Sequence, residues 1–332
     1  MDHIRVFTPE EEVDPDEAEV TEEPKPALDE VIAALIAGEY PRSVLVGLSD
    51  LGVRDAAELD RAWPQVDVGV RRAVPVELSD LAEERVDYVF HRALVTLLDD
   101  PDSAVRQLAI AGLWEGEDLR IASTLASMVR NDESEDVRAE AARGLGKFVE
   151  RIELGEIEGP VTEEVLGALR DTLEDDSESL HVRARALESM AVLSADETVQ
   201  AAIDRFYTED ETGYRATAIF AMGRSMNRSF LPTVLNETTS DDPEIRFEAA
   251  RAAGRLGDTS ALPMLAELAA DDDAEVRHAA ITGLGEIGGT AAVRYLRRLA
   301  EDAPEADHEL IEDAMEEATV VIDPLLLDED ST

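Results

Sequence analysis

Residues 276–288 read VRHAAITGLGEIG, and the recurrence of this stretch along the chain decides the fold. Its glycines at 283, 285 and 288 spell G-x-G-x-x-G, the spacing of a dinucleotide-binding loop, and His278 offers a metal ligand. A third interpretation is a structural repeat, because five related blocks precede this one. They are VRQLAIAGLWEG from Val105, VRAEAARGLGKF from Val137, VRARALESMAVL from Val182, YRATAIFAMGRS from Tyr214 and IRFEAARAAGRLG from Ile245.

The repeated unit has the length of one helical hairpin. Its arginines follow one another at intervals of 31 or 32 residues, apart from one interval of 45 that a loop around 150–162 can absorb. Each block also follows an acidic turn, such as DDPEI at 241–245 or DDDAE at 271–275. Asp and Ser side chains there can accept hydrogen bonds from the free N–H groups of a helix start. Each acidic turn therefore predicts the start of the second helix of a unit.

The first helix of each unit is also visible in the sequence. TSALPMLAELAA at 259–270 predicts a helix with Thr259 or Ser260 as its N-cap and Pro263 in its first turn, and the next first helix begins at Gly289. Two antiparallel helices of this length cannot bury their apolar faces alone, so the units must stack side by side. The sequence thus predicts an all-α fold, an α-solenoid.

The acidic turn followed by V-R-x-x-A-x-x-x-L-G resembles the HEAT repeat family, and specifically the short HEAT-like repeats of phycobilin lyases, from about residue 81 to 300. The resemblance implies an armadillo-like superhelix of stacked antiparallel helical hairpins. We predict a disordered acidic tail at 1–26, a degenerate N-terminal helical cap at 27–80, the repeat solenoid at 81–319 and a C-terminal tail at 320–332.

The charge of the chain is extreme, with 77 acidic and 30 basic residues and a net charge of −47. Only Lys25 and Lys147 are lysines, a bias that resembles proteins of extreme halophiles, in which solvent cations at high salt screen the repulsion. Direct binding of nucleic acid is excluded because it needs a dense basic surface. With no cysteine, no signal peptide and no apolar run of about 20 residues, we expect a cytoplasmic protein without a membrane contact.

The chemical interpretations of the opening stretch are weaker than the structural one. A dinucleotide loop needs a strand before its glycines, whereas these end a helix, and GLG recurs at 144–146. Deoxyhypusine hydroxylases, which are HEAT-like enzymes, imply His-Glu pairs for iron; here Ala279 follows His278, and only His308 is followed by Glu. We predict no metal, cofactor or catalytic residue. A bilin-lyase-like enzyme or accessory subunit stays the alternative.

The repeat arginines form a ladder. A guanidinium behind each acidic turn can bridge to an aspartate of its own or the adjacent turn, which predicts a structural role in setting the geometry between units. The ladder consists of Arg106, Arg138, Arg183, Arg215, Arg246 and Arg277.

A second column of residues faces away from the core on a helical wheel and should line the concave side of the solenoid. Against the acidic trend it collects Arg143, Lys147, Arg224, Arg251, Arg255, His278 and two exposed aromatics, Phe220 and Phe247. One interpretation is local, with arginines paired to Glu140 and Glu248 and the rings buried against neighbouring helices. The other is a groove that binds an acidic or apolar segment of a partner protein. On this second interpretation the chain is a non-enzymatic scaffold or adaptor.

Overall fold

The computed structural model describes residues 25–209 and 211–320, and all regular secondary structure in these ranges is helical. The prediction of an all-α solenoid is therefore confirmed. No helix within these ranges is both long enough and apolar enough to cross a bilayer. The tails predicted at 1–26 and 320–332 lie outside the described residues, apart from residues 25, 26 and 320.

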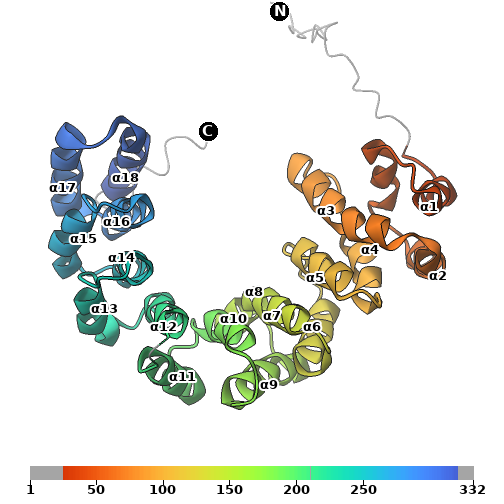
Figure 1. The fold of residues 1–332 in the computed structure, drawn as a ribbon, viewed down its shortest axis with the longest axis horizontal. Coiled ribbons are helices and arrows are strands. Elements are labelled where there is room, and N and C mark those ends of the chain that lie inside the picture. The colour runs from red at the N-terminus through yellow and green to blue at the C-terminus, as the bar shows by residue number, and fades with distance from the viewer. Residues whose placement is uncertain (1–24, 210, 321–332) are drawn as a thin grey trace, which may run out of the picture.

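The helices form an arc with an inner and an outer row (Figure 1). Successive inner helices pack side by side, and each outer helix from α4 onward packs on the inner helix that follows it. The inner helices are α3 (Val68–Glu84), α5 (Ser103–Gly112), α7 (Glu135–Gly144), α10 (Leu180–Met190), α12 (Thr212–Arg224), α14 (Pro243–Leu256), α16 (Ala274–Ile287) and α18 (His308–Val320).

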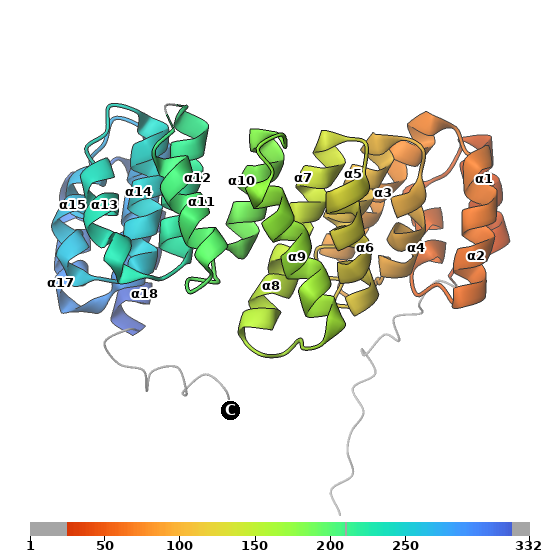
Figure 2. The same cartoon turned by 90° about the horizontal axis from the view of Figure 1, so that it is seen from below.

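The outer row covers the convex side, and seen from below the helices stand roughly parallel to one another (Figure 2). It contains α2 (Val53–Ala62), α4 (His91–Thr96), α6 (Leu119–Asn131), α9 (Pro160–Glu174), α11 (Glu197–Tyr207), α13 (Leu231–Glu237), α15 (Leu262–Leu268) and α17 (Gly289–Asp302). Two further α-helices are α1 (Leu28–Ala37) and α8 (Gly146–Glu153), and short 3₁₀ helices are η1 (Arg42–Leu48), η2 (Trp63–Gln65), η3 (Leu97–Asp99), η4 (Arg228–Phe230), η5 (Thr259–Ala261) and η6 (Glu305–Asp307).

Aspartates start helices in both rows. The side chain of Asp242 accepts a hydrogen bond from the backbone N–H of Glu244 at 3.0 Å and so caps α14. The N-cap predicted at Thr259 or Ser260 is wrong. Asp258 accepts from the backbone N–H of Ser260 at 2.9 Å and starts the 3₁₀ turn η5, which leads into α15.

The long interval between Arg138 and Arg183 contains an extra helix. A loop is predicted over 150–162, but α8 continues almost directly from α7 and ends only at Glu153, so the first part of that prediction is wrong. The connection before α9 is confined to residues 154–159. The helix predicted to begin at Gly289 is confirmed, since α17 begins at that residue.

Glycines let the inner helices approach closely. A Cβ atom on Gly254 of α14 would lie 2.7 Å from the Cα of Gly283 in α16, and one on Gly285 would lie 3.1 Å from the Cα of Ala314 in α18. Gly288 follows the last residue of α16 with a φ of 67°, a conformation that suits glycine. The glycines of the opening stretch therefore serve helix contact and helix termination, as predicted.

One continuous apolar core runs through the arc from Val31 in α1 to Ala318 in α18. It consists mainly of aliphatic side chains from both rows, which no single hairpin could bury. This core continues without a gap past residue 80, where the boundary between the N-terminal cap and the solenoid is predicted. The core therefore does not mark that boundary, which stays a prediction.

Candidate functional site

The six predicted ladder arginines lie on the inner helices, and five of them bind carboxylates of the following unit. Arg106 donates from Nε and Nη2 to Asp132 at 2.8 and 2.6 Å, and Arg246 binds Asp271 with the same two nitrogens, both at 2.8 Å. The corresponding pairs of other units are Arg138–Glu178, Arg215–Glu237 and Arg277–Asp307. Arg138 also uses two nitrogens, whereas Arg215 and Arg277 use one each; the two-nitrogen contacts are the stronger kind and fix the angle between the groups.

A third nitrogen of the guanidinium ties it to its own turn. Nη1 of Arg106 donates to the backbone oxygen of Asp100 at 2.8 Å, and Nη1 of Arg246 donates to that of Ser240 at 2.9 Å. Each arginine thus joins its own turn to the next unit. This geometry fits the structural role predicted for the ladder, which stays a prediction until the arginines are replaced.

Two positions depart from the predicted ladder. Arg183 is buried, lies 5.4 Å from the ring centroid of Phe206 and has no ion pair within residues 25–209 and 211–320. Conversely, Arg71 of α3 binds the buried Asp100 at 2.6 Å and belongs to the ladder although the prediction left it out. Its position directly after Val70, 35 residues before Arg106, was the available signal.

Four residues of the predicted concave column each have a separate partner within the described chain. Arg143 pairs with Glu140 on its own helix, and Arg224 pairs with Glu150 of α8. Lys147 donates to the backbone oxygen of Trp114 at 2.9 Å, and burial lowers its pKa to about 8. Nε2 of His278 lies 2.8 Å from Oδ1 of Asp307 in the following unit. These four side chains do not form one site.

The other four residues of the column do come together, where α12 faces α14. The guanidinium of Arg251 lies 5.5 Å from the ring centroid of Phe220 and 5.3 Å from that of Phe247. The guanidinium of Arg255 lies 5.1 Å from the Phe220 ring. Both rings are half-buried rather than exposed, and Arg251 also pairs with Glu248 at 3.2 Å. We call Phe220, Phe247, Arg251 and Arg255 the arginine–phenylalanine cluster.

The cluster lies in a groove formed by two adjoining hollows. One, with a volume of about 720 Å³, lies over α10, α12 and α14, and the other, of about 510 Å³, lies over α14 and α16; Arg251 lines both. We call them together the concave groove, since these are inner helices (Figure 1). His181 and Arg185 line it although the prediction left them out. Their spacing of four residues, which places them on one face of α10, could have shown this.

Three glutamates in the groove are partly desolvated. Burial raises the pKa of Glu188, Glu248 and Glu286 above the ordinary value, while nearby arginines lower it by smaller amounts. Oε2 of Glu248 is buried without a hydrogen-bond partner in the described chain. Burial thus disfavours the charged form of these three carboxylates.

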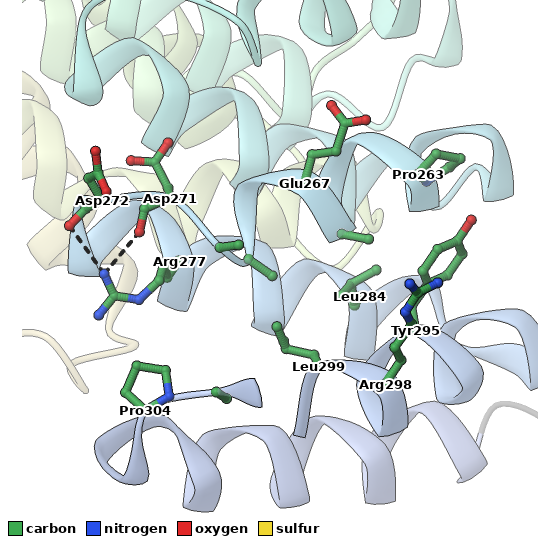
Figure 3. A pocket seen from close by; sticks show the side chains of 14 residues that line it. Pro263, Glu267, Asp271, Asp272, Arg277, Leu284, Tyr295, Arg298, Leu299 and Pro304 are labelled. Atoms are coloured by element: carbon green, nitrogen blue, oxygen red, sulfur yellow. Dashed lines mark hydrogen bonds between the residues drawn. The ribbon is translucent and has the colours of Figure 1, made fainter. Parts of the chain in front are cut away.

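A separate pocket of about 730 Å³ opens on the outer side between α15 and α17 (Figure 3). Leu284 and Leu299 lie in its middle, Tyr295 and Arg298 at one end, and Arg277 at the other, where its Nη1 donates to backbone oxygens of Asp271 and Asp272 at 3.0 and 3.2 Å. Its charged groups stand apart instead of converging. In the described ranges no three His, Cys, Asp or Glu side chains are grouped so as to hold a metal ion.

The comparisons with known proteins agree with this architecture. Residues 92–156 and 231–316 match the family of HEAT repeats, and no curated protein matches the sequence. Among solved structures, the complex of CpcE and CpcF of phycocyanin lyase from Nostoc sp. PCC7120 aligns with 69% of this chain and 94% of its own, at 17% identity and a TM-score of 0.47. Kap95p bound to RanGDP aligns with 88% and 45%, at 14% identity and a TM-score of 0.48.

Human deoxyhypusine hydroxylase in complex with glycerol is also similar, with 88% of this chain and 96% of its own aligned at 17% identity and a TM-score of 0.34. At such identities these likenesses concern the fold alone. Two stretches of the chain therefore match HEAT repeats in sequence, and the described units stack as helical hairpins, as the resemblance implies.

Proposed function

We propose that this protein is a non-enzymatic scaffold or adaptor that binds an extended segment of a partner protein along the concave groove. HEAT-repeat solenoids in general serve as protein-interaction scaffolds and present extended concave surfaces to their partners. The observation that carries the proposal is the arginine–phenylalanine cluster, since arginine and aromatic side chains contribute most of the binding energy in protein interfaces.

The groove suits a segment better than a small molecule. It crosses four inner helices from α10 to α16, and its two hollows are continuous at Arg251. A bilin-lyase-like enzyme, the alternative, needs polar side chains that converge on one cavity. In the outer pocket, Tyr295 and Arg298 stand at the opposite end from Arg277, so these polar side chains do not converge (Figure 3).

The absence of cysteine and the net charge of −47 support cytoplasmic action at high salt as part of this proposal.

Site-specific photo-crosslinking tests the proposal. A benzophenone amino acid at His181 or Thr282, two exposed groove positions 101 residues apart, should capture the same protein from a lysate of the source cells at native salt. The same group at Asp204 or Glu267, exposed on the outer helices α11 and α15, should capture none. Adducts of equal yield on both sides, or none from the groove, would contradict the proposal.

A further inference from the structure

Arg255 carries a cation that no acid of the described chain neutralises. It lies near the C-terminal end of α14, is half-buried in the groove, and makes neither an ion pair nor a hydrogen bond with any residue described. Burial lowers the pKa of Arg255, and the charges of Arg251 and Arg224 lower it further, while Glu286 and Glu248 oppose this. The folded protein therefore holds a guanidinium there at an electrostatic cost.

The acids around Arg255 are engaged or displaced. Glu248 is bound by Arg251 at 3.2 Å. Glu286 leans over the backbone of α14, where its Oε2 would lie 2.4 Å from a Cβ on Gly254. It stays more than 4 Å from the guanidinium nitrogens, the limit for an ion pair, and burial raises its pKa. The positive charge of Arg255 is thus available to a ligand.

The ring of Phe220 fixes how the charge is presented. A guanidinium that lies against an aromatic face keeps its edge free, and this edge matches a planar carboxylate through two parallel N–H···O bonds. Phe247 and Ala279 line the same hollow and offer apolar surface beside that edge. Glu275 and Glu286 line it as well, and they would repel a doubly charged phosphate more strongly than a singly charged carboxylate.

We propose, on the basis of the function proposed above, that Arg255 is the anchor for an aspartate or glutamate of the partner segment, with an apolar side chain of that segment next to it. The competing occupant is a basic segment, attracted by the acids in the first turns of the inner helices. These acids are Glu135, Glu244 and Glu275, which line the rim of the groove.

Peptide selection on the full chain tests the anchor. A display library of random dodecapeptides is selected at about 2 M KCl, where exposed charges are screened, on the wild type, on Arg255→Gln and on Arg294→Gln. Arg294 is exposed on the outer helix α17 and serves as the matched control. The wild type and the control should enrich Asp or Glu next to an apolar residue, and Arg255→Gln should lose the acidic preference.

A double-mutant comparison makes the contact specific. Replacing the acid of a selected peptide by its amide should weaken binding to the wild type about tenfold, or about 1.4 kcal/mol, and leave binding to Arg255→Gln unchanged. An unaltered circular dichroism spectrum confirms that Arg255→Gln folds. If its spectrum changes, Arg255→Lys is used instead; lysine keeps the charge but cannot form two parallel hydrogen bonds, so the acidic preference should be weakened but not lost.

The remaining outcomes of the peptide selection contradict either the anchor alone or both the anchor and the proposed function. If the wild type enriches no peptides, the proposed function and the anchor both fail. If it enriches peptides without an acidic preference, or with a basic one, or if Arg255→Gln keeps the acidic preference, the groove binds segments but the anchor is wrong.

Discussion

At the scale of single residues, arginines divide between two tasks according to what surrounds them. On the acidic-turn side of the inner helices a guanidinium meets a carboxylate of the next unit and backbone oxygens of its own turn, as Arg246 does. Toward the ends of the same helices it meets aromatic rings instead, as Arg251 and Arg255 do. The carboxylate and backbone oxygens around Arg246 accept hydrogen bonds from most of its N–H groups, whereas the ring beside Arg255 leaves the N–H groups of that guanidinium without acceptors in the described chain.

Replacing Arg246 by glutamine should destabilise the fold by about 2 kcal/mol, because Asp271 would stay largely buried without its two-nitrogen partner. The measurement is thermal or urea unfolding at constant high salt. Arg120→Gln is the matched control: Arg120 pairs with Asp118 two residues away, and its side chain is 84% exposed, so its loss should change little. Equal effects of the two replacements would contradict the structural role of the ladder.

The same variant should change the dependence of stability on pH. The hydrogen bond from Arg246 lowers the pKa of Asp271 below its unfolded value of about 3.9. The pair therefore stabilises the folded state above that value, and this contribution is lost as the pH falls through the lowered pKa. Arg246→Gln should flatten this acidic limb of the stability curve, and an unchanged limb would show that the pair does not contribute to it.

The sequence identified the ladder donors but not their acceptors. The Val-Arg pattern marks most donors, and Arg71 after Val70 could have been found by it; the pattern also marks Arg183, which has no ion pair in the described chain. The acceptors lie 22 to 40 residues further on. Glu178, which binds Arg138, lies in a turn of several acids whose composition does not indicate which side chain points inward, and Glu237, which binds Arg215, ends the helix α13. The cluster was predicted as residues on one face, whereas the stacking that half-buries its rings depends on how closely α12 and α14 pack.

At the scale of secondary-structure elements, the contact between α14 and α16 depends on glycine. Gly254→Ala would place a Cβ 2.7 Å from the Cα of Gly283, and two backbones cannot separate locally without disturbing the rest of the row. We expect a net loss of about 1–3 kcal/mol despite the better helix propensity of alanine. Gly213→Ala is the control, since its Cβ would have nothing nearer than Leu180 at 3.8 Å, and it should be neutral or stabilising.

Unfolding midpoints of the two glycine variants at the same salt concentration provide the comparison. A neutral Gly254→Ala would show that the inner helices separate without penalty. The repeat pattern predicted these close contacts, since the glycines recur at the same place in successive units. The pattern could not place the N-cap at Asp258 or the extra helix α8, because a 3₁₀ turn and a short helix leave no periodic signal of their own.

At the scale of the whole molecule, the chain carries a net charge of −47, and its described residues form an arc instead of a compact globule. On lowering KCl from about 2 M to about 0.1 M the Debye length rises to about 10 Å, so acids of neighbouring helices repel one another. We expect loss of helix, seen as a fall in far-ultraviolet circular dichroism. Full helicity at about 0.1 M would contradict adaptation to high salt.

A charge-reduced variant is the matched control for this salt dependence. Asp204→Asn, Glu267→Gln and Glu301→Gln together remove three exposed acids from the outer helices α11, α15 and α17. The KCl concentration at the unfolding midpoint should fall if repulsion causes the loss. An unchanged midpoint would assign the salt effect to something other than these charges.

The ladder also gives the array a direction. Each ladder arginine that binds a carboxylate in the described chain binds one nearer the C-terminus, and Asp307 receives the last of these guanidinium groups from Arg277. At the next donor position, 31 residues after Arg277, stands His308, which contacts the backbone oxygen of Ala303 and passes no guanidinium on. The ladder of ion pairs thus ends at the hairpin of α17 and α18. Any element that packs on the far side of α18 meets a junction without the ion pair that joins Arg246 to Asp271, so the ladder sets no angle there.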